Sequence, residues 1–178
     1  GVRVEEVELD LSFGRRAFLA LRGLWMVVQQ FARLDKLEEL GDNLGGNVRA
    51  GLALKAEELG EAEQIRGRIW ELFQDLLGNF DHLCTPCMAV SPFPVEQSHP
   101  MVIAGRQMKT YVDWFAPTFL LSLTGLPVAS VPCGLDAEGL PVGLQVVGRP
   151  RGEESVLALA QQIQNAHPIG LPPMEGAS

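Results

Sequence analysis

The stretch LSLTGLPVASVPCGLDAEGLPVGLQVVG, residues 121–148, decides the fold class that we expect for this chain. Its apolar runs, 127–135 and 140–148, flank the short segment DAEG. The glycine of that segment can adopt a positive φ, so an antiparallel hairpin is the natural interpretation. Pro132 donates no ladder hydrogen bond, which predicts a bulge or a sheet edge within the first run.

The regions outside this hairpin predict an α/β fold. Apolar side chains recur at helical spacing over 18–32 and again over 54–77, and each pattern marks one face of a long helix. DHLCTP, residues 81–86, predicts a short strand closed by proline, and Glu153 opens a final helix. Strands separated by long helices, with one late hairpin, indicate a mixed β-sheet flanked by helices. The face expected to be buried in the first helix comprises Phe18, Leu21, Trp25, Val28 and Ala32.

Further segments carry predictions of local structure. Residues 2–11 alternate between apolar and polar side chains on either side of a bulge at Glu5–Glu6, which predicts an opening strand. The glycine-rich segment 41–51 lacks the Lys-Ser or Lys-Thr ending of a phosphate-binding loop and is interpreted as a connection. The helix expected to start near Tyr111 is apolar nearly all round, which predicts that it lies in the interior.

The composition disfavours several classes of partner. The chain of 178 residues carries 14 Lys and Arg against 22 Asp and Glu, a net charge of −8. This sign repels phosphates and anionic lipids, so we expect neither nucleic acid nor a membrane surface as a partner. The uncharged run 114–135 is long enough to span a bilayer, but Gly125 and Pro127 interrupt it. Three cysteines without a secretory leader predict a reducing, cytoplasmic location.

No complete set of catalytic groups is visible in the sequence. The serines lie outside any G-x-S-x-G turn, and Lys36, Lys55 and Lys109 form no Ser-x-x-Lys pair. Ser122 and Ser130 are expected to be buried hydroxyls that bond to the backbone. The sequence therefore predicts no catalytic residue within this chain, and we expect no cofactor.

CTPC, residues 84–87, has the spacing of a redox or metal-binding pair, and Cys133, His82 and His99 are further candidate zinc ligands. A redox pair normally opens a helix, whose dipole lowers the thiol pKa, whereas Cys84 belongs to a predicted strand. We interpret the cysteines as small buried side chains and His82 as a hydrogen-bonded structural residue, so no metal site is expected. A thiol or zinc protein is the less favoured alternative.

Asp113 is a polar residue at the start of an otherwise apolar helix, after a loop rich in proline. A carboxylate in this place can cap the helix, because it interacts well with free N–H groups. It can also lie at a cavity wall and accept a hydrogen bond from a substrate. The residues alone leave both interpretations open.

The segment 110–161 closely resembles the carboxyl-terminal region of the amidase signature family, which includes bacterial amidases and the A subunit of the glutamyl-tRNA(Gln) amidotransferase. Weaker similarity extends upstream toward the first residues. The elements that carry the resemblance are Y-x-D-W at 111–114, L-T-G-L-P at 123–127, S-V-P-C-G at 130–134, G-L-P-V-G-L-Q at 139–145 and the last helix with its leading glutamates.

This resemblance implies that residues 1–178 are the carboxyl-terminal part of a single amidase domain with an α/β/α fold. Family members cleave amide bonds with a nucleophilic serine, a second serine joined by a cis peptide bond, and a lysine as the ultimate base. Those groups lie in a segment that precedes the region represented here, and this sequence contains no Ser-Ser dipeptide. The implied partners are therefore a missing amino-terminal catalytic portion and a small amide substrate.

The resemblance also implies a pair of substrate-binding residues. In the amidotransferase branch the acidic residue of Y-x-D lines the substrate pocket, and Asp113 matches it, whereas Trp114 matches ordinary amidases. The rival hypothesis is a non-catalytic interaction or scaffold module derived from the same fold. Because strands 2–11 and 127–148 would lack neighbours, we expect the lone chain to associate, and a homo-oligomer is a further expectation.

Overall fold

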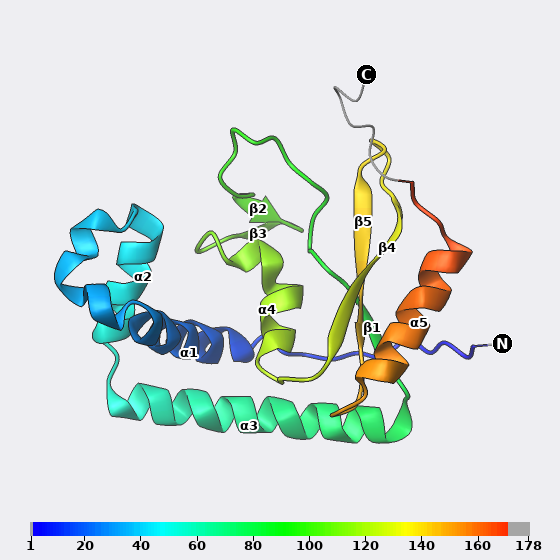
Figure 1. The fold of residues 1–178 in the computed structure, drawn as a ribbon, viewed down its shortest axis with the longest axis horizontal. Helices are drawn as coiled ribbons and strands as arrows, with labels where there is room; N and C mark the ends of the chain where they lie inside the picture. The colour runs from blue at the N-terminus through cyan, green and yellow to red at the C-terminus, as the bar shows by residue number, and fades with distance from the viewer. Residues whose placement is uncertain (1, 171–178) are drawn as a thin grey trace. The chain divides into compact units, whose positions relative to one another are not determined.

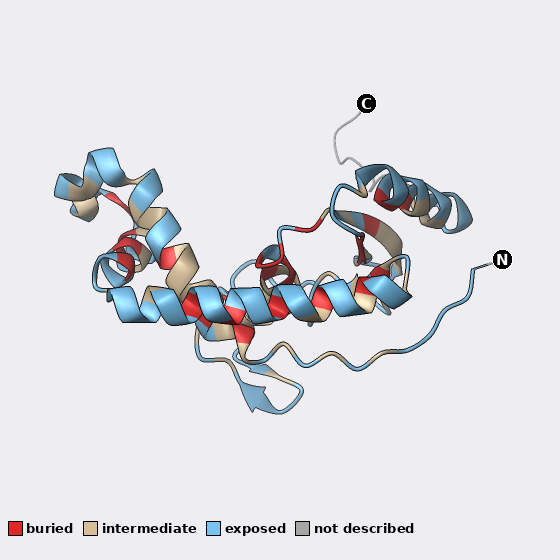
Figure 2. Ribbon diagram, turned by 90° about the horizontal axis from the view of Figure 1, so that it is seen from below, coloured by how far each residue is buried: buried red, intermediate tan, exposed pale blue. Residues whose placement is uncertain are grey.

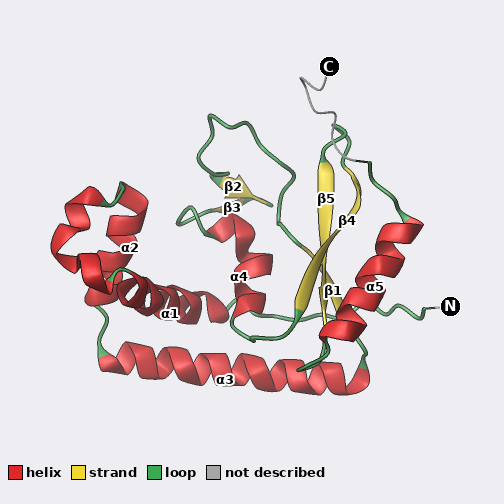
Figure 3. Cartoon of the chain, viewed as in Figure 1, coloured by secondary structure: helices red, strands yellow, loops and turns green. Residues whose placement is uncertain are grey.

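The computed structural model describes residues 2–170. The chain divides into two compact units, residues 1–73 and 74–178, and the boundary falls inside the longest helix. Figure 1 labels the helices and strands, and Figure 3 colours them by type. Among the described residues, no helix combines the length and the apolar character that crossing a bilayer requires.

The first unit is helical. Its helices α1 and α2 approach each other at glycines, because a Cβ atom added to Gly51 would collide with the backbone of Gly23. The last helix, α3, continues into the second unit. The elements are α1 (Gly14–Gln29), the 3-10 segment η1 (Phe31–Glu39), α2 (Asp42–Leu52) and α3 (Ala56–Asn79).

The prediction of a connecting loop at 41–51 is wrong, because these residues form α2. Glycine is a poor helix former on its own, which is why the local sequence favours a loop. Here Gly51 lets the backbone of α1 come within contact distance, and Asp42 lies in the first turn, where its charge suits the helix dipole. Packing between helices therefore outweighs the low helix propensity.

The prediction of an opening strand at 2–11 is also wrong. Residues 2–11 have no regular secondary structure, and Val2 and Val4 are 73% and 86% exposed. An alternating pattern produces a strand only where a neighbouring strand supplies hydrogen bonds, and the described strands pair elsewhere. Alternation of apolar and polar residues is therefore not sufficient to form a strand at residues 2–11.

The apolar face predicted for the first helix is present in α1 but is not buried as expected. Trp25 and Val28 are 59% and 63% exposed, and the helix ends at Gln29 instead of continuing through Ala32. α2 covers a different side of α1, the side that contains Gly23. Helical periodicity identifies an apolar face, but burial also needs an element that covers it.

The second predicted helix is confirmed as α3. Figure 2 shows that buried positions recur along this helix. Its most buried side chains follow one another at steps of three or four residues, as expected for one face of a helix. They are Ala62, Ile65, Ile69, Phe73 and Leu77.

The second unit contains a three-stranded sheet in the order β1-β5-β4, formed by β1 (Leu83–Pro86), β4 (Val128–Leu135) and β5 (Pro141–Val147). Both pairs within this sheet are antiparallel. A second, two-stranded sheet joins β2 (Val102–Ile103) to β3 (Arg106–Gln107) within the loop that precedes α4. The α/β class with helices beside the sheet is confirmed.

The hairpin that decided the fold class is confirmed in detail. The register between β4 and β5 shifts between Pro132 and Gly134, which is the bulge predicted at the proline. Gly139 has a φ of 81°, as the turn requires. Asp136 completes the turn, because its Oδ1 accepts hydrogen bonds from the backbone N–H groups of Glu138 and Leu140.

The two faces of the larger sheet differ in character. On one face, Val131 and Val146 pack against Val156 and Ala160 of α5 (Glu153–Ala166), as the spacing of the last helix predicts. The other face presents Gln145, which bonds to the first turn of α4 (Ala116–Ser122). The short 3-10 segment η2 (Asp113–Phe115) leads directly into α4, so the predicted site residues lie beside this second face.

Candidate functional site

The Asp113 carboxylate fixes the loop that leads into η2. Its Oδ2 accepts hydrogen bonds from the backbone N–H of Lys109 at 2.7 Å and of Thr110 at 2.8 Å. These two donors precede Asp113 in the chain, whereas an N-cap carboxylate accepts from N–H groups of the helix that follows it. Hydrogen bonds to a charged acceptor are strong, so the side chain is held in a defined position.

Trp114 belongs to a row of aromatic side chains. Its ring meets Phe93 at a centroid distance of 5.2 Å and Phe115 at 5.5 Å, both nearly perpendicular, and Phe115 continues to Phe119 at 5.8 Å. Such edge-to-face pairs favour one relative orientation of the rings. Trp114 is half-buried, and it directly follows Asp113 in the chain.

Backbone contacts attach this segment to the residues that follow β1. The N–H of Ala89 donates to the carbonyl oxygen of Trp114 at 3.4 Å, and the Thr118 hydroxyl donates to the carbonyl oxygen of Cys87 at 2.6 Å. Cys87 in turn continues the pairing of β1 with β5, because its N–H donates to the carbonyl oxygen of Gly143. The structure thus brings Asp113 and Trp114 close to the end of the first strand.

The structure identifies one residue of this region that the sequence interpretation missed, Gln145. Its amide nitrogen donates to Thr85 Oγ1, to the carbonyl oxygen of Pro86 and to the carbonyl oxygen of Pro117. The available signal was an amide side chain in an otherwise apolar strand, which requires partners when it is buried.

The cysteines differ from their prediction. Cys84 is exposed and Cys87 and Cys133 are half-exposed, so the expectation of small buried side chains is wrong. The chain bends after Pro86, and the Cys87 sulfur lies 3.1 Å from the hydroxyl of Ser130. Although Cys84 as a residue is exposed, partial burial of its thiol raises the pKa. A raised pKa leaves less thiolate at neutral pH, which disfavours a nucleophilic role for Cys84.

The serine predictions are confirmed only in part. Ser122 and Ser130 are both exposed, which contradicts the expected burial. The Ser122 hydroxyl does bond to the backbone, where it donates to the carbonyl oxygen of Phe119. Ser130 contacts a thiol instead. Within residues 2–170, the structure holds no group of three or more His, Cys, Asp and Glu side chains suited to a metal ion.

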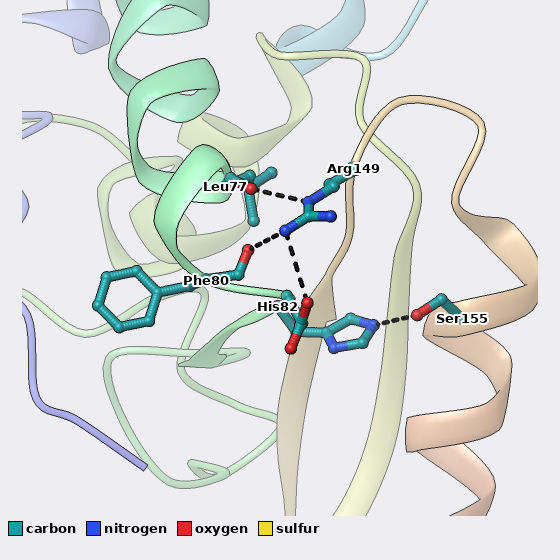
Figure 4. A network of polar contacts seen from close by, with 6 residues as sticks. Leu77, Phe80, His82, Arg149 and Ser155 are labelled. Atoms are coloured by element: carbon teal, nitrogen blue, oxygen red, sulfur yellow. Dashed lines mark hydrogen bonds and ion pairs between the residues drawn. The ribbon is translucent and has the colours of Figure 1, made fainter. Parts of the chain in front are cut away.

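Figure 4 shows a second group of polar contacts, in which Arg149, after β5, reaches the end of α3, and His82, before β1, reaches α5. Arg149 donates through Nε to the carbonyl oxygen of Leu77 at 2.7 Å and through Nη2 to that of Phe80 at 3.3 Å. His82 Nε2 lies 2.8 Å from the hydroxyl of Ser155, which confirms the prediction of a hydrogen-bonded histidine. Arg149 thereby satisfies carbonyl groups at the end of α3.

The contact between Ser155 and His82 is a serine–histidine pair that the sequence interpretation did not find. The distance of 2.8 Å between the Ser155 hydroxyl and His82 Nε2 meets one requirement for a nucleophile and its base, which is that they lie within hydrogen-bonding reach. Ser155 lies in the first turn of α5, and the bond joins that turn to the residue before β1. The pair therefore has a structural explanation, and its variant is a control in the experiments below.

Comparison with known proteins agrees with the resemblance of 110–161. The profile of the family described as Amidase matches residues 33–157. The acylamidase of Rhodococcus erythropolis is 30% identical over 152 residues, which cover 82% of this chain and 32% of that enzyme. The A subunit of the glutamyl-tRNA(Gln) amidotransferase of Methylorubrum populi is 57% identical over 107 residues, which cover 59% of this chain and 20% of that protein.

A solved amidase structure has the same fold, with a TM-score of 0.81 at 24% identity over 91% of this chain and 37% of that one. The chain spans about a third or less of the length of the curated relatives it matches. The family profile covers most of the described sequence, and the motifs of the hairpin fall entirely within the matched range. The chain therefore belongs to the amidase signature family.

Proposed function

We propose that this chain is the carboxyl-terminal part of an amidase whose nucleophilic serine, cis-linked serine and lysine are supplied by a separate amino-terminal portion. One observation carries the proposal: the family profile matches 33–157 in a chain that contains no Ser-Ser dipeptide. The acyl-enzyme would form on the other portion. The free cysteines of this chain fit a reducing compartment, which supports a cytoplasmic location.

Asp113 and Trp114 are the residues that we propose for substrate binding. The backbone bonds of Lys109 and Thr110 hold the carboxylate in one orientation, which suits a residue that must align an N–H donor of an amide. The indole ring provides the adjoining apolar surface. Their role is to bind and orient the substrate, whereas bond cleavage occurs at the serine of the other portion.

The aromatic row supports a substrate that carries an apolar or aryl group. The rings of Phe93, Trp114 and Phe115 present an apolar wall, and a planar substituent can pack against it edge to face. The acylamidase from Rhodococcus erythropolis carries a name that denotes acyl amides as its substrates. We therefore propose a small acyl amide with an aryl or alkyl substituent.

Fragment complementation tests this function. The 178-residue chain is mixed with the amino-terminal portion of an amidase that contains the serines and the lysine, and hydrolysis of an aryl amide is measured. We expect hydrolysis by the mixture and background rates from either piece alone. Ser155→Ala is the control variant, and it should leave the rate unchanged.

Two outcomes would contradict the proposal. Full hydrolysis by the chain alone, abolished by Ser155→Ala, would place the nucleophile within these residues. A well-folded, stable complex without any hydrolysis would favour the rival hypothesis of a non-catalytic module derived from the amidase fold.

A further inference from the structure

Gln145 is a buried polar residue with unusually distant partners. It lies within β5 and is 4% exposed. Among the described residues the other buried polar residue is Thr124, whose hydroxyl bonds to Leu121 and Leu126, both within three positions. The partners of Gln145 lie 28, 59 and 60 positions away along the chain. Its amide therefore organises tertiary structure and not a local turn.

The three acceptors come from two other segments. Nε2 donates to Thr85 Oγ1 at 3.0 Å, to the carbonyl oxygen of Pro86 at 3.0 Å and to the carbonyl oxygen of Pro117 at 3.3 Å. An amide NH2 group has two hydrogens, so one of them is shared. The group thus joins the middle strand of the sheet to the end of β1 and to the first turn of α4.

These bonds connect the sheet to the segment that carries the candidate site residues. Pro117 follows Asp113 and Trp114 by four and three positions, and η2 passes into α4 without a break. Two further hydrogen bonds join this region to the residues after Pro86: the Thr118 hydroxyl donates to the carbonyl oxygen of Cys87, and the N–H of Ala89 donates to that of Trp114. Gln145 therefore bonds to both segments, in addition to the ladder between β1 and β5 and the bond from the Cys87 N–H to the carbonyl oxygen of Gly143.

An apolar side chain of the same size cannot replace this group. Removal of the donor takes this hydrogen bond from the oxygens of Thr85, Pro86 and Pro117, and an apolar group then stands where the buried Gln145 amide made it. A shift of α4 away from the sheet would let water reach those oxygens. Such a shift would also move the carboxylate of Asp113 and the ring of Trp114.

We propose that Gln145 is a positioning residue that fixes segment 113–117, and with it the substrate-binding side chains, to the central strand. Its significance for substrate rests on the proposed function. The effect of Gln145 on the position of Trp114 is independent of the proposed function, so the positioning role and the proposed function can be tested separately.

The first experiment uses the chain alone, with Trp25→Phe and Trp70→Phe so that fluorescence reports only Trp114. In this background we expect Gln145→Met to shift Trp114 emission to longer wavelength. Hydrogen exchange at the amides of Asp113 and Phe115 should accelerate on the order of tenfold or more. The matched control is Val146→Ala, because Val146 is the next residue of the same strand but packs against α5 on the opposite face. It should lower the stability of the sheet without changing either signal.

Gln145→Glu distinguishes hydrogen bonding from packing. The protonated carboxyl can donate to one of the acceptors, whereas the carboxylate would face acceptor oxygens only. Burial raises the pKa of the introduced group, so native Trp114 emission should hold at low pH and be lost as the pH rises through that pKa, between about pH 4 and pH 8. Gln145→Met should show no such dependence. If Gln145→Met does not fold, the pH dependence of Gln145→Glu still tests the positioning role of Gln145.

The second experiment measures kinetics of the complemented enzyme. Gln145→Met should raise KM on the order of tenfold, and Val146→Ala should leave KM unchanged. If the unsubstituted mixture is inactive, the proposed function fails while fluorescence still tests Gln145. The positioning role is overturned if Gln145→Met leaves emission and exchange as in Val146→Ala, or if Gln145→Glu shows no pH dependence.

Discussion

Asp113 Oδ2 accepts two backbone hydrogen bonds from the loop before α4. Asp113→Ala removes the acceptor for the N–H groups of Lys109 and Thr110, so we expect the free energy of unfolding to fall by about 1–3 kcal/mol. Asp113→Asn keeps an acceptor oxygen in the same place and should lose less. Urea denaturation followed by circular dichroism measures both variants. Equal stability of Asp113→Ala and the unsubstituted chain would show that these bonds do not hold the loop.

The Cys84 thiol provides a test that depends on pH. Partial burial raises its pKa above the ordinary value of 9.0, because desolvation disfavours the thiolate. The contribution of this group to stability is therefore complete below the unfolded pKa and is lost as the pH rises through the folded pKa. Alkylation of Cys84 by iodoacetamide, followed by mass spectrometry, should reach half its maximal rate at higher pH in the folded chain than in urea. A lower midpoint in the folded chain would indicate an activated thiol and revive the redox alternative.

The close approach of α1 and α2 makes a clear prediction at the scale of elements. Gly51→Ala would force its methyl group against the backbone of Gly23, and we expect the first unit to lose about 1–3 kcal/mol or more. Gly46 lies in the same helix with open space around it, so Gly46→Ala should stabilise the unit by about 0.5–1 kcal/mol. Thermal unfolding of the two variants measures both changes. Similar effects of the two substitutions would contradict this packing.

The elements that the sequence predicted correctly are those whose determinants are local. The turn at 136–139 carries its own glycine and aspartate, and Pro132 marks its own bulge. Elements that depend on distant partners were predicted poorly. Segment 41–51 is helical because α1 lies against it, and the alternation of 2–11 produces no strand without a neighbour.

The residues of the candidate site show the same difference between local determinants and distant partners. Asp113 and Trp114 are recognisable because they belong to a short contiguous motif. Gln145 could not be identified in this way, since its role arises from acceptors on β1 and α4 that only the folded chain brings together. The same holds for the contact between His82 and Ser155.

At the scale of the whole molecule, the unpaired edge of the larger sheet can pair with a second copy of the chain. In the described part of the chain, β4 pairs with β5 on one side only, and Val128 of this strand is 40% exposed. We expect light scattering to give a mass above the 19.4 kDa of one chain. Val128→Lys should reduce that mass, because a charge on an edge strand opposes pairing. Leu157→Lys, at a 64% exposed position of α5, is the control and should have little effect. A monomer at all concentrations would contradict the expectation.

Our central proposal is that this chain forms the substrate-binding side of an amidase and that another polypeptide portion carries the nucleophile. The most direct measurement treats the complemented mixture with a fluorophosphonate that labels reactive serines, and mass spectrometry then locates the modified residue. We predict that the label is found on a serine of the amino-terminal portion and that all serines of the 178-residue chain remain unmodified. Stoichiometric labelling of a serine within this chain, Ser155 above all, would contradict the account.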